Sequence, residues 1–222
     1  MKISKDSIRR VVVFGPQGSG KGTQAEMISQ DLGIPWIATG NIYRKHIQEQ
    51  TELGKIAEKY SKEGKLVPDE ITNKLVEERI NEDDVQDGFV FDGYPRNIEQ
   101  AKTFGNIVNI DAVLEIAISD EEAISRISGR RVCPCGMTYH IKFNPPKKAG
   151  VCDKCGGELI HREDDTEPVI KERLAIYHHE TEPVLDMYLE QGVLIRINGE
   201  QSIQDVSNEI FQKLNNEEFA KK

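Results

Sequence analysis

Residues 11–23 read VVVFGPQGSGKGT, and this stretch decides the fold of the chain. The apolar run Val11–Phe14 is typical of a buried strand, and a helical pattern begins at Lys21. Between them, Gly15–Lys21 has the spacing G-x-x-x-x-G-K. Such a loop curls its backbone N–H groups around phosphate, and the positive end of the helix dipole adds attraction. The order of strand, loop and helix predicts a phosphate site rather than a glycine-rich turn with an incidental lysine.

One position departs from the usual loop, in which Ser or Thr follows the lysine directly. Here Gly22 intervenes and Thr23 follows. The charge of Lys21 is placed to reach the terminal phosphates of a nucleotide. The glycine at position 22 therefore limits the classes of phosphate-binding protein to which this chain can belong.

Short apolar runs alternate with longer helical patterns along the chain. The expected strands are Val11–Phe14, Pro35–Ala38, Gly88–Phe91, Ala112–Ile118 and Val193–Ile197. The expected helices are Lys21–Leu32, Pro68–Asn81, Ile98–Phe104 and Thr166–Gln191, the last kinked or divided at Pro183. This alternation predicts an α/β fold, a doubly wound parallel sheet with helices on both faces.

Two segments interrupt the alternation. Residues 39–67, the helical insert, are polar and have a helical pattern. Residues 129–165, the cysteine module, lose that pattern and gain Gly, Pro and Cys. We expect the core to consist of 1–38, 68–128 and 166–222, with these two segments as separate units.

The composition of the chain excludes some classes of partner and location. The 222 residues carry a net charge of −9, which argues against nucleic acid as the main partner. No apolar run approaches the ~20 residues that span a bilayer. The opening MKISKDSIRR lacks the apolar segment of a secretory signal, so we expect a cytoplasmic protein without membrane partners.

The cysteines fall in two close pairs, Cys133 with Cys135 and Cys152 with Cys155. Four thiolates on two short turns would saturate a tetrahedral Zn²⁺ and leave no open position, so we expect a structural zinc. A metal-free thiol cluster or disulfides are the alternatives. The C-x-C spacing of the first pair is short, which puts ligation by Cys133 in question. The nearby substitutes are Asp153, His140 and His161.

A carboxylate and a set of arginines point to nucleotide chemistry. Asp92 follows an expected strand, at the sheet edge where ligands of parallel sheets bind, and is placed to hold Mg²⁺ or its waters. A turn-capping aspartate is the alternative. Arginine favours bidentate phosphate contact, and several flank the two inserts: Arg44, Arg96, Arg130, Arg162 and Arg173.

With these residues in place, the chain resembles the adenylate kinase family, in its long-lid form that often carries zinc. The matching segments are GPQGSGKGTQ (Gly15–Gln24), ATGNIYR (Ala38–Arg44), GKLVPDE (Gly64–Glu70), FDGYPRNIEQA (Phe91–Ala101), RISGRRVCPCGMTYH (Arg126–His140), NPP with GVCDKCGG (Asn144–Gly157), REDD (Arg162–Asp165) and IKERL (Ile170–Leu174). They cover almost the whole chain, and G-K-G-T is itself typical of this family. Two positions depart from the family pattern: Asn41 stands where Asp is usual, and C-x-C stands where C-x-x-C is usual.

The resemblance implies a fold, that of P-loop nucleoside monophosphate kinases, with a five-stranded parallel sheet and two mobile inserts. It implies ATP binding by Gly18, Ser19, Gly20, Lys21, Gly22, Thr23, Arg126, Arg130, Tyr139, His140 and Glu200. It implies AMP binding by Thr39, Arg44, Lys65, Val67, Gly93, Arg96, Gln100, Arg162 and Arg173, with Gln100 reading the adenine edge. The implied catalytic groups are Lys21, Asp92, Arg96, Arg130, Arg162 and Arg173.

The implied reaction is Mg·ATP + AMP ⇌ 2 ADP, by a monomer that serves adenine nucleotide homeostasis. The partners would be ATP, AMP and ADP, and the cofactors Mg²⁺ with ATP and a structural Zn²⁺ in the lid at Cys133, Cys135, Cys152 and Cys155. Three other interpretations stay open at this point: a kinase for another nucleoside monophosphate, a non-catalytic nucleotide switch, and a zinc-ribbon nucleic-acid binder.

Overall fold

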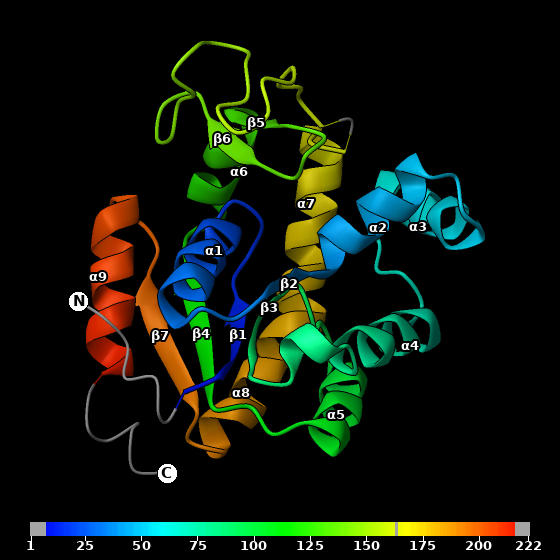
Figure 1. The fold of residues 1–222 in the computed structure, drawn as a ribbon, viewed down its shortest axis with the longest axis vertical. Coiled ribbons are helices and arrows are strands. Elements are labelled where there is room, and N and C mark those ends of the chain that lie inside the picture. Colours follow the sequence, from blue (N-terminus) through cyan, green and yellow to red (C-terminus); the bar gives the residue numbers. More distant parts are fainter. Residues whose placement is uncertain (1–7, 163, 216–222) are drawn as a thin grey trace.

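The computed structural model describes residues 8–162 and 164–215. Its centre is a five-stranded parallel sheet in the order β2-β3-β1-β4-β7 (Figure 1). The strands are β1 (Arg10–Phe14), β2 (Trp36–Ala38), β3 (Phe89–Asp92), β4 (Ala112–Ala117) and β7 (Leu194–Asn198). β1 lies between β3 and β4, with Val12 in register with Phe91 on one side and with Val113 on the other. The predicted doubly wound α/β sheet is confirmed.

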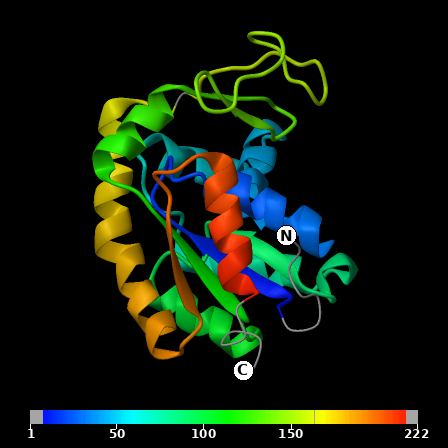
Figure 2. The same cartoon turned by 90° about the vertical axis from the view of Figure 1, so that its left-hand side faces the viewer.

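Alternate residues of β1 face two separate cores, as the period of a strand requires. Val11 and Val13 pack into a core with helices α1 (Lys21–Leu32) and α9 (Ile203–Leu214). Val12 and Phe14 pack into a second core. Its helices are α4 (Asp69–Ile80), α5 (Ile98–Ile107) and α8 (Glu182–Glu190). Figure 2 shows α1 and α8, which continues α7 (Glu167–Ile176), on opposite sides of the sheet. The central strands are therefore buried on both faces.

The helix expected over Thr166–Gln191 has an interruption near the predicted place. It consists of α7 (Glu167–Ile176), a π-helical turn (Tyr177–Thr181) and α8. Pro183 lies in the first turn of α8. A proline has no N–H to donate and its ring crowds the carbonyl four residues earlier, so the regular ladder widens into a π turn just before it.

Two helices were not predicted from the sequence, α6 (Asp120–Ser128) and α9. Both begin at serines that cap them: Ser119 Oγ accepts from Glu122 N, and Ser202 Oγ accepts from Asp205 N. A serine three residues before an acidic residue is the sequence signal for such a start. A short 3₁₀ turn (Asp83–Val85) precedes β3.

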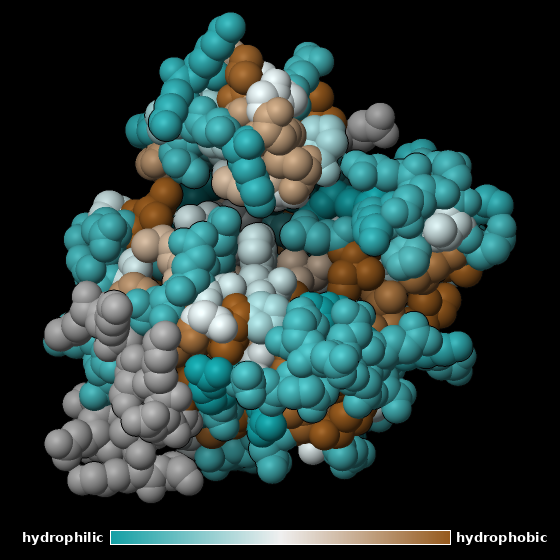
Figure 3. Space-filling view, in the orientation of Figure 1, coloured by the Kyte–Doolittle hydropathy of each residue, from teal (hydrophilic) through white to brown (hydrophobic). Residues whose placement is uncertain are grey.

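The two inserts project from the edge of the sheet at which its parallel strands have their carboxyl ends (Figure 1). The helical insert contains α2 (Thr39–Gln48) and α3 (Glu52–Lys62), as its helical pattern predicted. The cysteine module contains the antiparallel pair β5 (Arg130–Val132) and β6 (Thr138–His140), carried between α6 and α7. Figure 3 shows the molecular surface hollowed below this module.

Within 8–162 and 164–215, the model has no helix of the length and apolar character that a bilayer crossing demands. The prediction that the start of the chain is not a secretory signal concerns mostly residues 1–7, which lie outside the described part.

Candidate active site

The glycine-rich loop joins β1 to α1 and leaves the start of that helix open. Gly18 and Gly20 have backbone φ angles of 84° and 89°, which residues with a side chain rarely adopt. Gly20 is the N-cap of α1 and offers no side chain, so no cap occupies the first N–H groups of the helix. The Nζ of Lys21 donates to Pro16 O at 3.3 Å, so its ammonium group folds back over the loop. Backbone donors and one cation therefore converge there, as a phosphate site requires.

Gly22 lies next to the carboxylate of Asp92, at the end of β3. A Cβ at this position would lie 3.4 Å from Asp92 Oδ2 and 3.5 Å from the Trp36 ring. Both distances are ordinary van der Waals contacts, so Gly22 lies directly beside the start of β2 and the end of β3 without glycine being required there. Asp92 Oδ1 is buried and has no hydrogen-bond partner in the protein. A carboxylate with a free buried oxygen beside a phosphate loop fits a Mg²⁺ site, with Thr23 two residues beyond Lys21.

A second group of residues forms beyond the end of β3. Thr39 Oγ1 and Arg96 Nε both donate to Gly93 O, at 2.9 and 2.7 Å. Gly93 has a φ of 85°, and a Cβ there would lie 2.8 Å from Thr39 Oγ1. Thr181 Oγ1, in the π turn, donates to Arg96 O at 2.8 Å. The predicted residues Thr39, Gly93 and Arg96 are thus brought together, and Gln100 joins them by accepting from Arg96 N.

The cations from both groups lie close enough to shift one another's pKa. Burial lowers the pKa of Lys21 to about 8, Asp92 opposes this, and three arginines add to it: Arg96, Arg130 and Arg162. Burial, together with the charges of Arg130 and Arg44, lowers the pKa of Arg162 to about 9. Burial also lowers the pKa of Arg44 to about 10, with Arg130 the next contributor. Crowded, partly desolvated cations of this kind favour a polyanionic ligand.

Carboxylates and one amide hold these arginines in place. Arg130 forms a two-armed ion pair with Asp165, whose side chain is fully buried. Arg173 pairs with Asp164 and donates to Ser61 O of the helical insert at 3.3 Å. Arg44 Nη2 donates to Asn41 Oδ1. Arg162 Nε is buried without a partner. The cations are therefore oriented, and part of their hydrogen-bonding capacity is still available.

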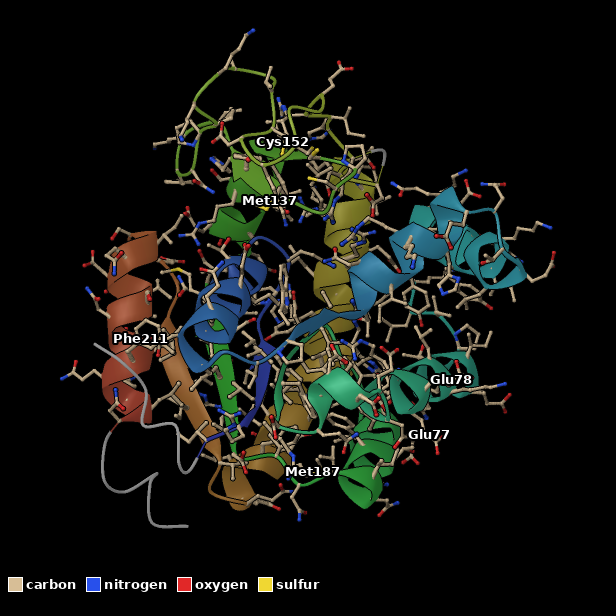
Figure 4. The ribbon with its side chains drawn as sticks, viewed as in Figure 1. Glu77, Glu78, Met137, Cys152, Met187 and Phe211 are labelled. Carbon is tan, nitrogen blue, oxygen red and sulfur yellow. The ribbon has the colours of Figure 1, made fainter. Side chains whose placement is uncertain are left out.

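The four thiols come together at one point of the cysteine module. Among the residues described, Cys133, Cys135, Cys152 and Cys155 form a group whose sulfurs all lie within 4.8 Å of one another. They form no disulfides. Figure 4 shows Cys152 and the neighbouring Met137 in this module. Burial opposes ionisation of Cys152, but hydrogen bonds from Cys155 N, the Tyr139 hydroxyl and Lys154 N lower its pKa to about 6. The donor set fits a tetrahedral zinc, and the short C-x-C spacing does not keep Cys133 out of it.

Two of the three substitute ligands considered for zinc, His140 and Asp153, make other contacts. His140 Nδ1 accepts from Lys142 N and Phe143 N, both at 3.0 Å. The carboxylate of Asp153 accepts from Lys147 N at 3.0 Å. His161, like these two, does not belong to the thiol group.

Several predicted binding residues lie outside the cation cluster. Tyr139 is buried inside the cysteine module, where its hydroxyl accepts from Asp153 N at 2.8 Å. Lys65 is exposed and pairs with Glu63 at 2.8 Å. The carbonyl of Val67 accepts from Thr72 Oγ1 at 3.3 Å. Glu200 Oε1 accepts from the backbone and hydroxyl of Ser119, so it anchors the start of α6.

One candidate was missed in the sequence. The ring of Phe143 is 45% exposed and lies 5.5 Å from the guanidinium of Arg126 and 4.6 Å from the His140 ring. Arg126 is itself held by Glu122 at 2.7 Å. A half-exposed aromatic ring beside an oriented arginine is a surface on which a planar base can stack. The sequence signal for this candidate was an aromatic residue, Phe143, next to Lys142 and close to His140.

The parallel sheet, the loop at Lys21 and the two inserts define the P-loop nucleoside monophosphate kinase fold. A family model described as adenylate kinase matches residues 13–193. Relatives named adenylate kinase share much of the sequence. The one from Caldanaerobacter subterraneus subsp. tengcongensis is 48% identical over 211 residues, 92% of this chain and 96% of the relative. That from Methanothrix thermoacetophila is 47% identical over 209 residues, 92% and 97%. That from Streptomyces avermitilis is 42% identical over 219 residues, 96% and 100%. The chain belongs to the adenylate kinase family.

Proposed function

We propose that this protein transfers the terminal phosphoryl group of Mg·ATP to AMP and forms two ADP. The observation that carries the proposal is the convergence of Lys21 with arginines from both inserts and from the core, next to Asp92. The loop provides one phosphate site, and the group around Gly93 and Arg96 provides another. A protein that only held one nucleotide would have no use for this second site.

The transfer needs alignment and charge neutralisation more than covalent chemistry. The attacking oxygen belongs to the AMP phosphate and is already anionic, so no general base is required. Lys21, Arg130 and Arg162 are placed to balance the negative charge that spreads over the transferred group. Holding two nucleotides in line contributes of order 7–11 kcal/mol in favourable cases. When bound, Mg²⁺ adds further neutralisation of phosphate charge, and Asp92 and Thr23 are the residues that would hold it.

The two inserts and the base-binding residues also have roles in this reaction. The helical insert (39–67) serves as the AMP-binding unit and the cysteine module (129–165) as the lid, on the core of 1–38, 68–128 and 166–222. Arg126 and Phe143 offer a stacking surface for the donor base, and Gln100 reads the acceptor base. Zinc on the four thiols holds the lid in shape. Closure of both inserts excludes water, so that ATP is not lost to hydrolysis. We expect a monomer that contributes to adenine nucleotide homeostasis.

A coupled assay with ATP and each of AMP, GMP, CMP and UMP tests this function. We expect AMP to give the highest kcat/KM by a wide margin. A preference for another monophosphate would assign the chain to a different acceptor, and no turnover with any of them would leave a nucleotide-binding protein without transferase activity.

Lys21→Met gives the largest expected loss of activity. Removal of the loop cation should lower kcat by about 100-fold or more, because its charge is most needed in the transition state. The fold should persist, since Lys21 makes one weak contact, to Pro16 O at 3.3 Å. Lys102→Met, on the exposed face of α5, is the matched control and should retain normal turnover. Near-normal turnover of Lys21→Met would overturn the assignment.

A further inference from the structure

The side-chain amide of Gln100 is buried and held from two sides. Its Oε1 accepts from Arg96 N at 2.8 Å, and its Nε2 donates to Asp69 Oδ1 at 2.7 Å. A backbone N–H can only donate, and an ionised carboxylate can only accept. These two neighbours therefore decide which end of the amide is oxygen and which is nitrogen.

Asp69 is itself fixed. It is the first residue of α4, and Asn97 Nδ2 lies 3.1 and 3.0 Å from its two carboxylate oxygens. Asn97 in turn caps α5, because its Oδ1 accepts from Gln100 N at 2.8 Å. The carboxylate thus belongs to an ordered contact between two helices, and its hydrogen bond to Gln100 joins side chains 31 positions apart in the chain.

This arrangement leaves a defined pattern for a ligand. An amide has two lone pairs on oxygen and two hydrogens on nitrogen, and the protein uses one of each. The remaining acceptor and donor match the edge of a 6-aminopurine, which offers the N6 hydrogens and the N1 lone pair. A 6-oxopurine offers O6 and N1–H, the reverse pattern. Accepting it would require the amide to turn over, which would set Oε1 against the Asp69 carboxylate and Nε2 against Arg96 N–H.

We propose that Asp69 is a positioning residue that locks the amide of Gln100 and so makes the acceptor site select 6-amino over 6-oxo purine monophosphates. The proposal rests on the proposed function, in which Gln100 reads the acceptor base. Asp69 acts through Gln100 and needs no contact with the nucleotide.

Asp69→Asn tests the lock, because the asparagine amide can present either oxygen or nitrogen to Gln100 and so permits both orientations. The measurement is kcat/KM for AMP and for inosine monophosphate, which differs from AMP at the 6-position edge and lacks the 2-amino group of GMP. We expect the AMP-to-inosine-monophosphate ratio to fall about tenfold or more, since an unmatched buried hydrogen-bonding group is costly. Where turnover of inosine monophosphate is too slow to measure, its inhibition constant against AMP supplies the ratio.

Glu70→Gln is the matched control, because it neutralises the adjacent exposed carboxylate, and its ratio should equal that of the wild type. Asp69→Ser is a second variant, used if Asp69→Asn does not fold by circular dichroism. An equal fall of kcat/KM for both nucleotides would show that Asp69 only ties α4 to α5, and would overturn the inference. A wild-type protein that does not phosphorylate AMP would instead overturn the proposed function, so the two failures are distinguishable.

Discussion

The helical insert and the cysteine module both interrupt the same sheet, yet different interactions hold them in shape. In the helical insert, α2 packs closely against α3, and Thr51 caps α3 by accepting from Gly54 N at 3.0 Å. Among the described residues of the cysteine module, the buried cluster consists of Cys133, Tyr139, Cys152 and Leu159, with the partly buried Met137 packed against it. A core this small cannot offset the entropy of ordering its loops, so we infer that the thiols and their metal must do so. Packing of two helices therefore holds the helical insert, whereas we infer that ligation by the four thiols holds the cysteine module.

The largest expected effect comes from removing the thiols. Metal binding contributes of order 10 kcal/mol in small zinc modules, so Cys152→Ser combined with Cys155→Ser should abolish most local stability of the cysteine module. Hydrogen exchange should show loss of protection across β5 and β6 and no change in α2 and α3. Chelation of the wild-type protein should act in the same way.

The control for this pair is Ile160→Ser, which changes a 48% exposed side chain of the same module. It should leave protection near the wild-type level. Protection of β5 and β6 that survives loss of both thiols would show that the module folds without metal.

Gly54→Ala tests the other insert. A Cβ on Gly54 would lie 2.0 Å from the carbonyl oxygen of His46, so α2 and α3 must separate to admit it. We expect Gly54→Ala to lower stability by about 2–3 kcal/mol. Hydrogen exchange should show that the lost protection is limited to the helical insert. Gly105→Ala, on α5 with open space around it, is the control and should be neutral or stabilising by up to ~1 kcal/mol. Equal effects of the two variants would contradict close packing at Gly54.

A smaller effect concerns ligand binding by the helical insert. Asn41 holds the Arg44 guanidinium with a neutral oxygen. Asn41→Asp would replace this contact with an ion pair that the AMP phosphate must displace, so KM for AMP should rise about 3- to 10-fold with little change in kcat. Asn208→Asp, on the exposed face of α9, makes the same charge change and should leave KM unaltered. An unchanged KM in Asn41→Asp would mean that Arg44 does not contact AMP.

The smallest expected effect depends on pH and concerns a histidine beside α6, the helix that leads into the cysteine module. His178 contacts Asp120, at the start of α6, and Glu182, both at 2.9 Å, and the hydrogen bond to Asp120 raises its pKa above the usual 6.5. A raised pKa means that the stabilisation is fully present below about pH 6.5 and is lost as the pH rises through the folded-state value. His178→Gln should therefore lower the melting temperature at pH 6 and have less effect at pH 8.

This difference should be small, a few tenths of a kcal/mol, because the three side chains are partly exposed and screened. His179→Gln, at the 85% exposed neighbouring position, is the control and should change the melting temperature little. A melting difference that grows from pH 6 to pH 8 would contradict the ion-pair role of His178.

Much of the fold and part of the site followed from local patterns. The five strands of the main sheet were predicted to within one residue at each end, and the glycine-rich loop was recognised from its spacing. The helices α6 and α9 were missed although each has a buried face at helical spacing, Ala123 with Ile127 in α6 and Val206, Ile210 and Leu214 in α9. The contact of Phe143 with Arg126 was also missed, because it joins two elements and has no fixed sequence spacing.

Local sequence was enough to predict the strand–loop–helix order at Lys21, the alternation that builds a parallel sheet, and the supply of arginines and thiols. These depend on backbone preference and on residue type, which neighbouring residues reveal. Three features are visible only in the folded chain: Gly22 lies beside Asp92 and Trp36, the arginines crowd around Lys21, and Asp69 hydrogen-bonds to the amide of Gln100. These contacts join distant segments, and their geometry depends on how the helices pack across the sheet.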